Sequence, residues 1–162
     1  MMGGHTFGGR YAPQALSLLR IVAALIFLMH GTAKLFGFPE TELPMPEAGS
    51  LMWAGGLLEF VGGLMLLVGI LSRPVAFILA GEMAVAYWMF HAPEALYPLQ
   101  NGGDAAILYC FVFLFIAAAG PGPWSIDARL PQRDDSEPGV EGYMAPGGER
   151  QYKPEDFGDG RS

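Results

Sequence analysis

Five ionisable side chains stand inside long apolar stretches of the sequence. They are Arg20, His30 and Lys34 in residues 16–36, Glu59 in residues 51–71, and Glu82 in residues 75–90. At about 100° per residue of helix, Arg20, His30 and Lys34 fall on one face. Because an unpaired ion in hydrocarbon is costly, these groups are expected to pair inside the protein or to have a function.

The depth of each group along its helix predicts which groups meet. A helix rises about 1.5 Å per residue, so the position of each group in its segment gives its depth. Together with His91 and Asp104 near the outer surface, the five groups fall into three layers. The predicted layers are Arg20 with Glu82, His30 with Glu59, and Lys34 with His91 and Asp104. Opposite charges are expected to pair in the first and third layers.

The middle layer is the candidate catalytic pair. A histidine and a carboxylate at mid-depth, His30 and Glu59, could relay protons or hydrogen-bond a quinone carbonyl. All three layers also have a purely structural interpretation, as clamps that fix helix register. The outer layer could hold a small polar ligand. No metal site is predicted, because His30 and His91 lie far apart in sequence and no short ligand spacing exists.

Composition excludes several classes of protein. The chain has 162 residues, only 15% of them charged, and a formal net charge of −7 with no run of bases. This balance argues against a disordered chain and against a nucleic-acid binder. The single cysteine, Cys110, excludes an intrachain disulfide and a Cys-ligated zinc or iron–sulfur site.

The elements that must position these groups are four apolar segments, which predict an all-α, membrane-embedded four-helix bundle. They are residues 16–36, 51–71, 75–90 and 104–120. The expected organisation is an N-terminal tail over 1–14, the membrane domain over 15–130, and a polar, disordered tail over 131–162.

The second segment carries glycines in two columns with a period of seven residues. Gly55, Gly62 and Gly69 form one column, and Gly56 and Gly63 the other. Small residues let helix backbones approach closely in lipid, so Glu59, which lies among them, is expected to point into the bundle.

Basic residues near the membrane predict orientation. Arg10, Arg73, Arg129 and Arg133 fall on one side, and the other side has Lys34. The positive-inside rule then places both termini in the cytoplasm of a multi-pass protein in the inner (plasma) membrane.

The chain resembles the DoxX family of bacterial small membrane proteins. The matching stretches are RIVAALIFLMHGTAKLFG (20–37), EFVGGLMLLVGILSRPVAFILAGEMAVAY (59–87) and HAPEALYPLQNGGDAAILYCFVFLFIAAAGPGPWSID (91–127). At the NGG element many relatives carry Glu where this chain has Asp104. The resemblance implies a four-helix membrane bundle. It also implies a redox-associated role, since some relatives are subunits of quinone-linked sulfur oxidation and others associate with oxidative-stress enzymes.

Three functions are compatible with these features. The first is a quinone-interacting membrane subunit, without a covalently bound cofactor or stand-alone activity, that acts with a soluble or membrane redox partner. The second is a non-catalytic scaffold linked to oxidative or thiol stress, whose tail recruits a soluble partner. The third is a small-solute or proton transporter, which the narrowness of four short helices disfavours. The sequence makes no prediction of oligomeric state.

Overall fold

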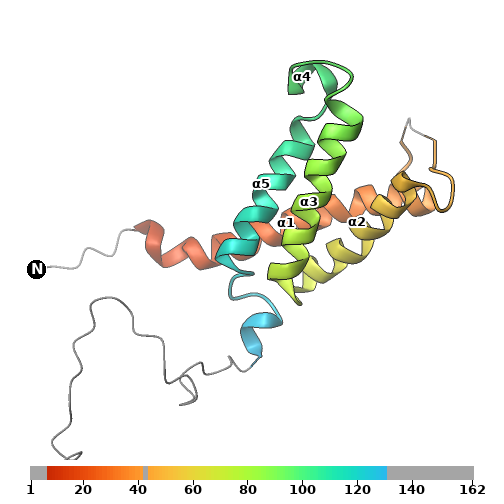
Figure 1. Ribbon diagram of the computed structural model, residues 1–162. Coiled ribbons are helices and arrows are strands. Elements are labelled where there is room, and N and C mark those ends of the chain that lie inside the picture. The colour runs from red at the N-terminus through yellow and green to blue at the C-terminus, as the bar shows by residue number, and fades with distance from the viewer. Residues whose placement is uncertain (1–6, 42–43, 131–162) are drawn as a thin grey trace, which may run out of the picture. The chain divides into compact units, whose positions relative to one another are not determined.

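The computed structural model describes residues 7–41 and 44–130, and the predicted tail over 131–162 lies outside them. Every regular element in the described part is helical (Figure 1). The elements are α1 (Phe7–Phe36), α2 (Leu51–Val68), α3 (Ser72–Ala86), the π-helical η1 (Tyr87–His91), α4 (Pro98–Asn101), α5 (Asp104–Ala119) and η2 (Asp127–Arg129). The four long helices match the four predicted segments, which confirms the all-α fold.

These helices are suited to a bilayer. Gly9–Phe36, Leu51–Val68 and Ser72–His91 are long and apolar enough to cross a membrane, and Asp104–Ala119 is a shorter apolar helix. Large apolar side chains such as Leu25, Phe77 and Phe111 lie exposed on the outside. Because such a surface is unfavourable in water, the chain is an integral membrane protein.

Helix α1 begins earlier than predicted. Residues 7–14, expected to belong to a flexible tail, form its first two turns, and Pro13 lies inside the helix. Gly8, Gly9 and Pro13 are poor helix formers, so local propensity contained no start signal. Tertiary contact supplies the missing support, because the Ser17 hydroxyl donates to the Pro13 carbonyl and accepts from the Trp124 amide.

The helices form two main pairs, α1 with α2 and α3 with α5, and α2 also packs on α3. In Figure 1 the α1–α2 pair runs across the α3–α5 pair. A tight turn joins α2 to α3, where Gly69 ends α2 with a left-handed φ of 74°. That conformation closes a helix end at little cost only when the residue is glycine.

Glycines set how closely α2 meets its two neighbours. A Cβ added at Gly63 would lie 3.2 Å from Leu28 Cα on α1, and one added at Gly62 would lie 2.8 Å from the Leu79 side chain on α3. The closest approach is made by Gly31 of α1, where an added Cβ would lie 2.5 Å from the Phe60 backbone nitrogen. The two predicted glycine columns therefore face two different helices.

The loop after α5 binds the start of α3. The Asp127 carboxylate accepts from the backbone N–H groups of Leu71 and Ser72, at 2.9 Å and 2.8 Å. These amides have no partner within α3, so Asp127 caps the helix from a distant part of the chain. At the same end of the pair, the Arg73 guanidinium in the first turn of α3 donates to the Ala117 and Ala118 carbonyls at the end of α5.

The ionisation of Asp127 reflects this capping role. Partial burial works to raise its pKa, but the hydrogen bonds from Ser72 and Leu71 and the charge of Arg20 outweigh it. The pKa of Asp127 is therefore lowered from its usual value. A carboxyl whose pKa is lower in the folded state stabilises the fold above its unfolded pKa of about 3.9, and loses that effect as the pH falls through the folded value.

We predict that Gly31→Ala destabilises the fold by about 1–3 kcal/mol, because its methyl group would meet rigid α2 backbone. Gly81→Ala is the matched control, since a Cβ at that helical position meets nothing within 4 Å. Thermal unfolding in detergent measures both variants. Equal stability of the two would show that the α1–α2 approach is looser than described here.

We also predict that Asp127→Asn lowers stability at pH 7 by about 1 kcal/mol, the usual effect of losing a helix cap. The difference from wild type should shrink below about pH 4, because protonation then weakens the wild-type cap as well. Unfolding at both pH values measures this. Glu94→Gln, at an exposed loop position, should have no effect at either pH, and a pH-independent loss in Asp127→Asn would contradict the cap.

Candidate functional site

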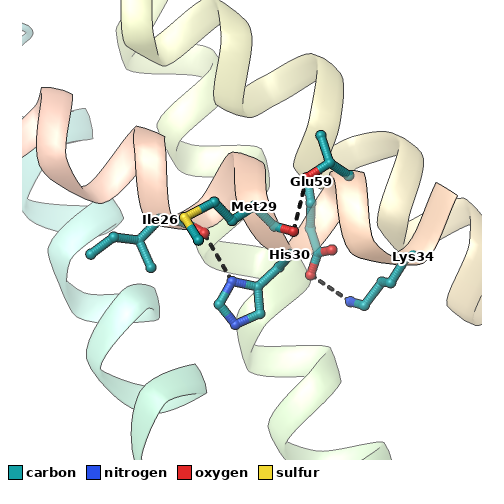
Figure 2. Close-up of polar contacts among 6 residues, drawn as sticks. Ile26, Met29, His30, Lys34 and Glu59 are labelled. Atoms are coloured by element: carbon teal, nitrogen blue, oxygen red, sulfur yellow. Dashed lines mark hydrogen bonds and ion pairs between the residues drawn. The ribbon is translucent and has the colours of Figure 1, made fainter. Parts of the chain in front are cut away.

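The centre of the site is an ion pair between α1 and α2. The Lys34 ammonium donates to Glu59 Oε1 at 2.6 Å. The Glu59 side chain is only 2% exposed, whereas that of Lys34 is 27% exposed. Figure 2 shows the Glu59 carboxylate reaching from α2 toward Lys34. The prediction that Lys34 belongs to an outer layer with His91 and Asp104 is therefore wrong.

Glu59 is buried because glycines surround it on α2. It lies four residues after Gly55 and four before Gly63, at the seam between the two glycine columns. With hydrogen in place of side chains at these positions, α1 and α3 close over the carboxylate from both sides. The prediction that Glu59 points into the bundle agrees with this burial.

Glu82 of α3 enters the same region. Its Oε1 would lie 3.3 Å from a Cβ added at Gly55, so the carboxylate fills space that a side chain there would take. Glu82 interacts electrostatically with both Glu59 and Lys34. The Oε2 atoms of Glu59 and Glu82 are buried and have no hydrogen-bond partner among the described residues. The Lys34 ammonium thus acts electrostatically on both carboxyls, but among the described residues it forms an ion pair with Glu59 alone.

Arg20 does not pair with Glu82, and that prediction is wrong. Its side chain is fully buried and donates to backbone carbonyls instead. The acceptors are Leu66 and Leu67 at the end of α2, and Pro121 and Trp124 in the loop after α5. The last carbonyls of a helix lack intrahelical donors, and a guanidinium has five N–H groups to offer. Arg20 thus ties three segments together.

His30 lies beside the ion pair rather than in it. Its Nδ1 lies 2.9 Å from the Ile26 carbonyl, and its ring meets Tyr109 of α5 edge-on, with 6.2 Å between centroids. His30 is near enough to act on Glu59 electrostatically when its ring is protonated, but the Glu59 hydrogen bond goes to Lys34. Figure 2 shows the ring turned back along α1 toward Ile26. The prediction that His30 pairs with Glu59 is therefore wrong: the two side chains lie near each other, but each has a different hydrogen-bond partner.

The predicted outer cluster is dispersed. His91 Nδ1 lies 2.9 Å from the Asn101 carbonyl. Asp104 is exposed in the first turn of α5, where its negative charge interacts favourably with the helix dipole. With Lys34 engaged by Glu59, the three residues do not form a site. Within residues 7–41 and 44–130, no group of three His, Cys, Asp or Glu side chains is placed to hold a metal ion.

Tyr109 is the neighbour of the candidate site that sequence reasoning missed. It packs between His30 and the buried rings of Phe27 and Phe113. A signal was present, because Tyr109 is the only residue with a hydroxyl in the apolar run over 105–119. Tyrosine is enriched where its ring lies among apolar groups and its hydroxyl reaches water or a hydrogen-bond partner.

The apolar helices and the inward charged groups define an integral membrane protein. The family model of DoxX matches residues 15–92. A Haemophilus influenzae protein described as uncharacterized is 37% identical over 126 residues, which cover 75% of this chain and 94% of that relative. The chain belongs to the DoxX family. No solved structure matches it significantly.

We predict that double-mutant cycles separate true pairs from predicted ones. Lys34→Met and Glu59→Gln should show a coupling energy of about 1 kcal/mol or more in detergent unfolding, because either change alone leaves one partner of a buried pair. Arg20→Met and Glu82→Gln should be additive within about 0.5 kcal/mol, since the two side chains have different partners. Strong coupling of Arg20 to Glu82 would contradict the carbonyl network.

Proposed function

We propose that this protein is a quinone-interacting membrane subunit that acts with a redox partner. The observation that carries the proposal is His30, an exposed imidazole on the outer, apolar surface of the helices. A polar ring in that position is costly in lipid unless something there uses it. The ring is held by Ile26 and Tyr109 and lies beside the Lys34–Glu59 pair.

The hydrogen bond to Ile26 assigns roles to the two ring nitrogens. A carbonyl can only accept, so Nδ1 donates to it, and Nε2 of the neutral ring presents a lone pair. A lone pair recognises a hydroxyl rather than a carbonyl. We therefore propose that His30 accepts a hydrogen bond, and then a proton, from the hydroxyl of a hydroquinone. The oxidised quinone is bound less tightly by the neutral ring.

The surroundings of His30 suit a lipid-soluble ring. Ile26 and Met29 are exposed next to it on α1, and Figure 2 places both side chains around the imidazole. Apolar side chains beside one oriented polar group are the usual features of a small-molecule site. The Tyr109 ring adds an aromatic edge against which a quinone ring could pack.

A partner follows from the chemistry of these residues. Histidine, tyrosine and carboxylates move protons under ordinary conditions, whereas oxidation of a hydroquinone also releases electrons. We propose that a soluble or membrane partner carries the centre that accepts them. We further propose that the protein resides in the inner membrane with both termini in the cytoplasm, on the grounds of Arg10, Arg73 and Arg129 near one end of the helices.

The scaffold function remains a second candidate because of Arg20. Arg20 is fully buried and donates to four backbone carbonyls, so its role is to stabilise the fold. The other charged groups in the bundle could have the same structural role. In that case substitutions at His30 would leave ligand binding and cellular function unchanged. The small-solute or proton transporter stays a third candidate, which these contacts do not test.

We predict that purified protein in nanodiscs binds a short-chain benzoquinol more tightly than the matching benzoquinone. His30→Leu should weaken quinol binding about tenfold, which corresponds to about 1.4 kcal/mol, the value of one good hydrogen bond. Quenching of tryptophan fluorescence during titration measures the affinity. His91→Leu is the matched control, since its ring is bonded to the Asn101 carbonyl, and it should bind as wild type does. Equal binding by His30→Leu would refute the role of His30.

A further inference from the structure

The buried Glu59 and the half-buried Glu82 lie with Lys34 over one turn of α2. Helical side chains lean toward the N-terminus, so that of Glu59 covers the turn that contains Gly55 and Gly56. Glu82 Oε1 lies over Gly55, and Lys34 Cβ would be 2.8 Å from a Cβ added at Gly56. Residues four apart on a helix have Cβ positions only about 5–6 Å apart. The glycines thus open one small space that all three side chains enter.

The charges in this space do not balance when both carboxyls are ionised. Lys34 supplies one positive charge, whereas Glu59 and Glu82 would supply two negative ones. An uncompensated charge buried among apolar helices is strongly unfavourable, and such groups become neutral instead. One additional proton makes the three groups neutral as a set.

The hydrogen bonds in this space also lack one donor, in agreement with the missing positive charge. Glu59 Oε1 is bonded to Lys34, while Oε2 of Glu59 and Oε2 of Glu82 are both buried without a partner. A buried polar atom left without a partner costs about 1–3 kcal/mol. A carboxylate can only accept, but a protonated carboxyl can also donate. A proton on either carboxyl would therefore add a hydrogen-bond donor to a space whose unpaired oxygens can only accept.

Among the described residues around the space, His30 is the one further base that acts on a carboxyl of the pair, and it adds positive charge only when its ring is protonated. Within the described residues, Lys34 and His30 are the charges that act on Glu59, and Glu59 and Lys34 are those that act on Glu82. The other titratable side chains of the elements packed around α3 are Tyr87, His91, Asp104, Tyr109 and Cys110. Of these, Tyr109 packs on His30, His91 bonds the Asn101 carbonyl, and Asp104 is exposed.

We propose that Glu59 and Glu82 form a proton-binding site, in which the two carboxyls share one exchangeable proton and Lys34 is their counter-ion. The ligand of this site is the proton itself. Glu59 itself is buried, whereas Lys34 and Glu82 are both half-buried, so these two side chains connect the site to the outside. The site is separate from quinone binding, because neither carboxyl belongs to the proposed hydroquinone contact at His30.

The proton can be detected with dicyclohexylcarbodiimide, a lipid-soluble reagent that modifies protonated carboxyls. The carboxyl proton moves to a carbodiimide nitrogen, and the carboxyl oxygen adds to the central carbon to form an O-acylurea, so no other reactant is consumed. The experiment treats the full chain in nanodiscs at neutral pH, and peptide mass spectrometry finds the modified residue. We expect one adduct per chain, at Glu59 or Glu82.

Variants then test the sharing. Glu59→Gln and Glu82→Gln should each reduce labelling to background, because the remaining carboxylate pairs with Lys34 and stays ionised. Lys34→Met should instead allow both carboxyls to be modified, since without the cation both become protonated. Asp104→Asn, which removes an exposed acid outside the site, should label as wild type does. Unchanged labelling in either Gln variant, or no adduct on the wild type, would overturn the proposal.

A measurement on the wild type alone covers the case in which a variant fails to fold. Infrared spectra of protein with isotope-labelled glutamate should show the carbonyl band of a protonated carboxylic acid at neutral pH, and that band should shift with the isotope. Its absence would overturn the shared proton. A shared proton in a protein that binds no quinol would refute the proposed function alone, so the two failures can be told apart.

Discussion

The close approach of α2 to its two neighbours is the constraint on which the rest of the structure depends. One glycine column meets α1 and the other meets α3, and backbone atoms would clash with any larger residue at Gly31. Packing between small residues replaces the hydrophobic effect, which provides no driving force between helices surrounded by lipid. The same glycines leave room for polar side chains, so the close contact between α1 and α2 is also where the Lys34–Glu59 pair lies.

The bundle satisfies its buried charges in two different ways. Arg20 donates to four backbone carbonyls, and these bonds join α1 to the end of α2 and to the loop after α5. Lys34 and Glu59 satisfy each other only in part, because one oxygen of Glu59 and one of Glu82 are left over. The first arrangement is complete and can only hold the fold. The second leaves buried oxygens without a hydrogen-bond donor, and a polar network with unpaired acceptors is where a proton or a ligand can bind.

The apolar segments and the glycine period were sufficient to predict four helices and an inward Glu59, because both signals are periodic and local. The partners of Arg20 and Lys34 were missed because depth along a helix ignores the reach of long side chains. Backbone carbonyls as partners also leave no trace in sequence. His30 was placed on the face of Arg20, yet ten residues turn a helix by about 80° short of three full turns. It therefore lies at the edge of that face, where α1 is open.

The position of His30 gives the two proposed sites a physical connection without a hydrogen-bond chain. His30 acts on Glu59 through charge, and Lys34 lies one turn farther along the same helix. A proton taken up by His30 would add positive charge beside the carboxyl pair, and positive charge favours ionised carboxylates. Binding of a proton at His30 would therefore promote release of the proton shared by Glu59 and Glu82. Linkage is reciprocal, so each of the two proposed sites would oppose proton binding at the other.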